Sequence, residues 1–166
     1  MSHVPLYVYL LFALLLKMGI SRCYPRTIRI ERLLIMPGLL AVLGARGYFG
    51  LFPSPAPVDL LAGIGGAGIG MAIGYHHARA WAITVDKRER TLSVPGDVMM
   101  LVVILATFFF EFALHYAIES TAISRTNPLL PAVAAAGWAL FFGMTLGRNI
   151  NLASRFVTNP AASTIG

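Results

Sequence analysis

Five stretches of mostly apolar residues alternate with shorter polar stretches along the chain. Each holds 17 to 21 residues, and they cover 4–20, 33–52, 58–74, 98–118 and 129–146. An α-helix needs about 20 such residues to cross the hydrocarbon core of a bilayer. The pattern therefore predicts an all-α membrane protein, a bundle of five transmembrane helices in which residues 1–150 form a single integral membrane domain. Residues 151–166 show neither helix length nor apolar periodicity, so we expect a flexible cytoplasmic tail there.

The connection between the third and fourth stretches has a different period. Apolar side chains recur at every second position on both sides of a polar turn, at Trp81, Ile83 and Val85 and then at Leu92 and Val94. This alternation is typical of a β-hairpin with a longer loop. An isolated hairpin is only marginally stable in water. We therefore expect a short hairpin-like loop that rests on the ends of the helices.

The composition agrees with a membrane location. Of the 166 residues 57% are apolar and 12% are charged, whereas a soluble domain carries about 25% charged residues. So little polar surface cannot cover a water-soluble globule, which excludes a cytosolic enzyme, a disordered tail and a disulfide-rich secreted module. The single cysteine, Cys23, cannot form an intramolecular disulfide.

The distribution of basic residues predicts the orientation of the chain. Of the 13 Lys and Arg residues, 11 lie at the first connection, in the third connection and after the fifth stretch. Because basic residues collect on the cytoplasmic side of a membrane, we expect the N-terminus outside and the C-terminus in the cytoplasm. The same residues would attract anionic lipid. We expect no nucleic-acid binding, because the basic residues lack an aromatic-rich platform.

Small residues form a stripe along the third stretch. Ala62, Gly66, Gly70 and Gly74 recur at every fourth position and so share one helix face. Such stripes let two helix backbones approach closely in a membrane. This predicts a packing surface, either within the subunit or between copies of a homo-oligomer, and we favour packing within the subunit.

Four ionisable residues fall inside the apolar stretches or at their edge. Arg46 and Glu111 each lie thirteen residues after the start of their stretch, so both would lie about 20 Å from the cytoplasmic edge. His115 follows Glu111 by one helical turn, and Asp59 lies near the outer boundary. An ionisable group at membrane depth normally faces a partner or a water-filled cavity. We therefore predict an intramembrane polar cluster in which Arg46 and Glu111 approach within about 4 Å.

This cluster has two interpretations. The Arg46–Glu111 pair could fix the register of two helices, as buried ion pairs sometimes do. Alternatively, Glu111 and His115 could form a proton or substrate site with Arg46 as an anion anchor. The sequence contains no catalytic motif and no zinc-ligand spacing, so we expect no catalytic residues, no metal and no cofactor.

Short motifs in the first and third connections suggest a family. They are the segment 24–29 (YPRTIR), the proline at Pro37, the segment 83–86 (ITVD) and the segment 92–96 (LSVPG). This layout resembles the small multi-spanning CcdC-like membrane proteins of bacteria and related families. The resemblance implies a bacterial inner-membrane location and an accessory role of the kind associated with cytochrome c biogenesis.

Two classes of function remain open on the sequence. The first is a non-enzymatic accessory or assembly protein that works beside a membrane-protein partner in the lipid bilayer. The second is a small transporter or proton-linked permease that uses Arg46, Glu111 and His115.

Overall fold

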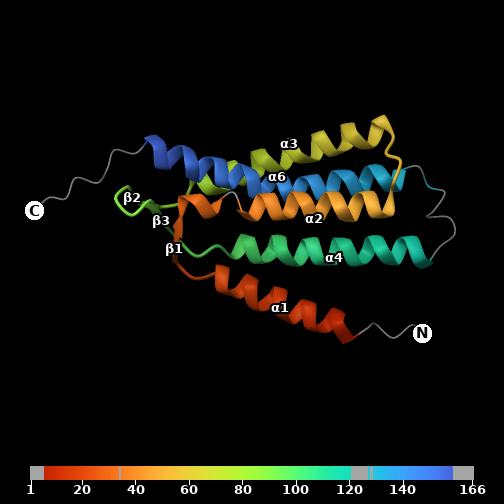
Figure 1. The fold of residues 1–166 in the computed structure, drawn as a ribbon, viewed down its shortest axis with the longest axis horizontal. Coiled ribbons are helices and arrows are strands. Elements are labelled where there is room, and N and C mark those ends of the chain that lie inside the picture. Colours follow the sequence, from red (N-terminus) through yellow and green to blue (C-terminus); the bar gives the residue numbers. More distant parts are fainter. Residues whose placement is uncertain (1–5, 34, 121–126, 128, 159–166) are drawn as a thin grey trace, which may run out of the picture.

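The computed structural model describes residues 6–33, 35–120, 127 and 129–158, and this part of the chain is mostly helical. Its α-helices lie along the long axis of the molecule (Figure 1). They are α1 (Leu6–Arg22), α2 (Ile35–Leu51), α3 (Pro57–Arg79), α4 (Val98–Ser120) and α6 (Leu129–Thr158). A small sheet lies at the end of the bundle where α1 ends and α4 begins (Figure 1).

Three of these helices are long and apolar enough to cross a membrane. They are α3, α4 and α6, with mean hydropathies of 1.4, 2.2 and 1.8 in their most apolar windows. The helices α1 and α2 have 17 residues each, about 26 Å of helix, which is slightly less than the roughly 30 Å hydrocarbon core. The chain is thus a multi-pass membrane protein with three candidate spans, and crossing by α1 and α2 stays a prediction.

The helices α3 and α6 pack with their backbones in direct contact. Gly66, Gly70 and Gly74 of α3 face the backbone of α6, where a Cβ atom at each would collide with Ala136, Leu140 and Met144 in turn. The contact is reciprocal, because Gly143 and Gly147 of α6 face the backbone of Ala67 and Met71. The paired positions advance together, so the two helices are parallel. The glycine stripe therefore packs within the chain, and Ala62 is half-buried at its start.

The sheet has three antiparallel strands, β1 (Arg26–Arg29), β2 (Thr84–Asp86) and β3 (Thr91–Val94), in the order β1-β3-β2. The hairpin β2–β3 lies where the alternating pattern predicted strands. Its turn is held by the Asp86 carboxylate, which accepts hydrogen bonds from the backbone N–H groups of Arg88 (2.9 Å) and Glu89 (3.1 Å). The expectation of a hairpin alone was incomplete, because β1 pairs with the free edge of β3, with Ile28 opposite Leu92.

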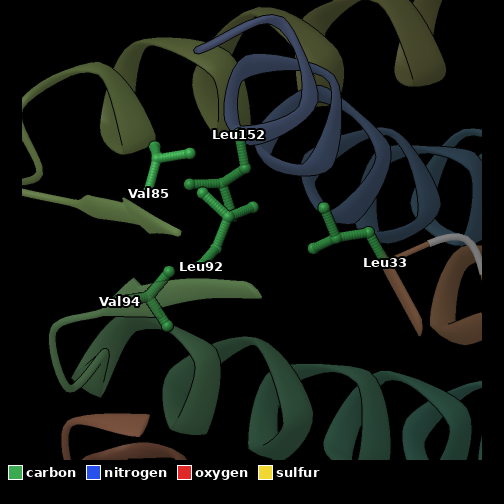
Figure 2. Close-up of a cluster of buried hydrophobic side chains, with 5 residues drawn as sticks. All are labelled: Leu33, Val85, Leu92, Val94 and Leu152. Atoms are coloured by element: carbon green, nitrogen blue, oxygen red, sulfur yellow. The ribbon is translucent and has the colours of Figure 1, made fainter. Parts of the chain in front are cut away.

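A small hydrophobic core joins the sheet to the end of α6. Its buried members are Leu33, Val85, Leu92, Val94 and Leu152, and Figure 2 shows Leu152 of α6 pointing toward Leu92 of β3. Leu92 and Leu152 are 0% and 2% exposed. The helix continues to Thr158 because its last turns are packed against the sheet. The sequence placed the start of a flexible tail at residue 151, which is too early; residues 159–166 lie outside the described part.

We predict that Gly70→Ala lowers the stability of the protein by about 1–3 kcal/mol, the usual cost of overpacking. The added methyl group would meet the backbone of Leu140 and Met144, which cannot move without separating α3 from α6. Gly68→Ala is the matched control, since nothing lies within 4 Å of the added atom. Thermal unfolding of the detergent-solubilised protein measures both, and equal stability of the two variants would contradict the close packing.

Candidate functional site

The predicted pair between Arg46 and Glu111 is not formed. Arg46 is exposed and takes part in none of the ion pairs found among the described residues. Glu111 instead lies beside Gly47, where a Cβ atom would stand 3.9 Å from Glu111 Oε1. Consecutive helical residues point about 100° apart, so the α2 face that meets α4 is that of Gly47 and not that of Arg46. Equal depth in the membrane was therefore not enough to predict a contact, because the two side chains must also face each other.

Glu111 and His115 do lie together, one turn apart on α4. His115 Nδ1 is 3.7 Å from Glu111 Oε1 and 3.0 Å from the Glu111 carbonyl oxygen. Trp138 of α6 also reaches this place, because its Cζ2 atom would lie 3.7 Å from a Cβ on Gly47. Glu111 Oε2 and Trp138 Nε1 are both buried and have no hydrogen-bond partner among the described residues.

Asp59 has a different surrounding, in the first turn of α3. Its Oδ2 atom accepts a hydrogen bond of 2.8 Å from the backbone N–H of Ala56. Its carboxylate also interacts electrostatically with the Tyr48 phenol. A carboxylate at this position is favourable because it satisfies a free N–H and faces the positive end of the helix dipole. Asp59 therefore stabilises the start of α3.

A second group of charged side chains gathers at the sheet end, and the sequence analysis did not find it. Asp97, 7% exposed, comes immediately before α4. Its Oδ2 accepts a hydrogen bond of 3.0 Å from Arg148 Nη1 of α6, and its Oδ1 lies 3.2 Å from His77 Nε2 of α3. The backbone N–H of Asp97 donates to the Arg22 carbonyl at the end of α1 (2.9 Å). One aspartate thus connects four helices.

Two further arginines lie near this ion pair. Arg22 and Arg26 line a cavity of about 40 Å³ together with Asp97, Arg148 and Asn149. Neither guanidinium group has a hydrogen-bond or ion-pair partner among the described residues. We call the group formed by Arg22, Arg26 and Arg148 around Asp97 the basic site.

The charge of the basic site is not balanced. Burial, and then the charges of Arg22 and Arg148, lower the pKa of Arg26 to about 10, and Asp97 acts in the opposite direction. A base with a lowered pKa binds its proton less tightly in the folded state than in the unfolded chain. Its charge therefore costs stability at neutral pH, and this cost falls as the pH rises from about 10 toward the ordinary value. One carboxylate does not compensate three guanidinium groups.

The sequence held weak signals for this site. In the sequence, Arg22, Arg26 and Arg148 predict orientation and attraction to anionic lipid, with Arg148 in the tail after the last span, and nothing there indicates that they meet. Arg148, Asn149 and Asn151 would lie on several faces of a helix that continued through them. At least one of them would then face the protein interior, where a polar group needs a partner. The partner of Arg148, Asp97, is 51 positions away in the chain, so no local pattern connects the two.

The fold and its buried charges define a multi-pass helical membrane protein with a charged site where its helices meet a small sheet. The chain belongs to DUF6622, a family of unknown function, whose family model matches residues 1–156. No curated protein and no solved structure matches it.

We predict that Arg148→Gln destabilises the protein by about 3–5 kcal/mol, because it leaves the buried carboxylate of Asp97 without its arginine. The double variant Asp97→Asn/Arg148→Gln should recover part of this loss, because it also removes the buried carboxylate that Arg148→Gln leaves without its arginine. Glu31→Gln is the control, because it removes the exposed Arg90–Glu31 pair (3.4 Å), which contributes at most about 1 kcal/mol. Denaturant unfolding in detergent compares the three, and a loss for Arg148→Gln no larger than for Glu31→Gln would contradict the assignment.

Proposed function

We propose that the protein is a non-enzymatic accessory protein of the membrane that binds an anion of the phosphate class at the basic site. The observation that carries this proposal is the charge imbalance: three arginines line one cavity with a single carboxylate, and two of them have no partner among the described residues. An anion in the cavity would supply the missing acceptors.

The geometry of arginine supports an oxyanion. A guanidinium group presents a rigid fork of N–H donors that matches the oxygens of phosphate or carboxylate, often through two parallel hydrogen bonds. Arg22 and Arg26 are only partly buried, so a ligand can reach them from outside the protein. The cavity of about 40 Å³ exceeds the roughly 10–15 Å³ that a single water needs by the same measure.

The orientation belongs to the same proposal. We place the sheet, the basic site and the end of α6 in the cytoplasm and the start of α1 outside, in a five-span topology. The excess of basic residues at the sheet end supports this orientation. The resemblance to CcdC-like proteins supports a bacterial inner membrane and an accessory role beside another membrane protein or a second copy.

We predict that inorganic phosphate raises the melting temperature of the detergent-solubilised protein at constant ionic strength. A phosphate concentration ten times its Kd stabilises the folded protein by about 1.4 kcal/mol. The double variant Arg22→Gln/Arg26→Gln should lose this response, yet be at least as stable as the wild type without phosphate, since it removes uncompensated charge. Arg79→Gln/Arg88→Gln is the matched control with two exposed arginines removed. The same phosphate response in both double variants would refute the site.

Proton-linked transport at Glu111 and His115 is the second candidate. It is favoured by the buried Glu111 Oε2 atom, which has no hydrogen-bond partner among the described residues. The neighbouring Trp138 lines a hollow of about 250 Å³ between α2 and α6, although Glu111 and His115 do not line it. A carboxyl group at membrane depth is a common element of proton relays. Because Arg46 is exposed, the site in this candidate consists of Glu111 and His115 alone.

If this candidate is correct, proteoliposomes that contain the protein should dissipate an imposed pH gradient, and Glu111→Gln should abolish the flux by removing the titratable group. Glu31→Gln, an exposed carboxylate at the sheet end, should leave the flux unchanged. A pH-sensitive dye inside the vesicles reports the rate. A flux equal to that of protein-free vesicles would exclude the candidate.

A further inference from the structure

The basic site lies at the level where apolar helices begin and end. Arg22 is the last residue of α1, and Asp97 comes directly before α4. The two helices are neighbours here, because a Cβ atom on Gly19 would meet the side chain of Leu101. Trp81, a residue type enriched at membrane–water interfaces, also lines the cavity. In a bilayer this is the depth of the lipid headgroups.

An apolar stripe runs along the outward face of α4, away from the face where the buried Met100 contacts Arg148. Five exposed residues lie close to whole helical turns apart and therefore share one face: Val98, Val102, Phe109, Phe112 and Tyr116. The stripe starts one residue after Asp97. From Val98 to Phe109 it extends about 16 Å, roughly half of the hydrocarbon thickness of a bilayer. That is the depth of the acyl chains of a single leaflet.

The charge of the site selects among lipids. A zwitterionic headgroup would bring its own ammonium group toward Arg22 and Arg26, whereas an anionic headgroup adds only negative charge. With one carboxylate for three arginines, the site gains most from a headgroup of net negative charge.

Building on the proposed function, we infer that the anion bound at the basic site is the phosphate of an anionic glycerophospholipid whose acyl chains lie along the exposed stripe of α4. Arg22 and Arg26 donate to the phosphate oxygens. Arg148 stays on Asp97 and holds the site in place. The lipid thereby joins α1, β1 and α4 from the side of the bilayer.

The test titrates three probes into the full-length protein in detergent and follows the melting temperature: phosphatidylglycerol, phosphatidylcholine and the soluble headgroup analogue glycerol 3-phosphate. We expect phosphatidylglycerol to bind at least about tenfold more tightly than phosphatidylcholine, because both present the same phosphate but the choline ammonium is repelled by Arg22 and Arg26. Arg22→Gln/Arg26→Gln should remove that preference. Arg26→Lys keeps the charge but not the forked pair of N–H donors, so its preference should be intermediate between those of the wild type and the double variant. Arg79→Gln/Arg88→Gln should keep it.

A second pair of variants tests the acyl chains. Val102→Asn places a polar group on the stripe. It should weaken the binding of phosphatidylglycerol without changing the binding of glycerol 3-phosphate. Val133→Asn is its matched control, because Val133 is also exposed and is also the fifth residue of its helix, at the other end of the bundle. It should change neither.

The outcomes separate the two proposals. If glycerol 3-phosphate and inorganic phosphate stabilise as well as phosphatidylglycerol and Val102→Asn has no effect, the site binds a soluble anion, and the lipid inference is overturned while the proposed function stands. If none of the anionic probes depends on Arg22 and Arg26, both are overturned.

Discussion

The buried carboxylate of Asp97 fixes the relative positions of the helix ends at the sheet side of the bundle. It receives the guanidinium of Arg148 from α6 and the imidazole of His77 from α3, and its backbone N–H is bonded to the end of α1. A carboxylate that lost these partners would remain buried and uncompensated, at a high cost in free energy. The sheet depends on this arrangement, because β1 starts four residues after Arg22 and β3 ends three residues before Asp97.

The close contact between α3 and α6 brings the partners of Asp97 together. Lipid tails are as apolar as the helix surfaces, so association in a membrane relies on close packing and on polar contacts. Gly74 lies on the backbone of Met144. One turn further along the two parallel helices come His77 and Arg148, which face the same carboxylate from adjacent positions. The tight packing of small residues therefore decides where the charged residues meet.

The features that the sequence predicted are those that depend on local periodicity. The helical spans follow from runs of apolar residues, the hairpin from alternation, and the stripe of α3 from glycines four residues apart. The third strand could not be predicted in this way, since Arg26–Arg29 is four residues long and its partner β3 is far away in the chain. Counting residues along the helix estimates the depth of Arg46 but not the side of the helix on which it lies. The next residue, Gly47, points about 100° away and is the one beside Glu111. Arg148 was missed for a related reason: its burial depends on Asp97, on another helix.

The length of α6 has a mechanical consequence. Its 30 residues form a rod of about 45 Å, longer than the roughly 30 Å hydrocarbon core, and the sheet packs against the end that this excess length provides. Leu152 packs in the same buried cluster as Leu92 at that junction, which ties the sheet to this end of the helix. Any tilt of α6 that accommodates a thinner or thicker bilayer therefore swings the sheet, and with it β1 and Arg26, by a distance that increases with the length of the arm outside the membrane.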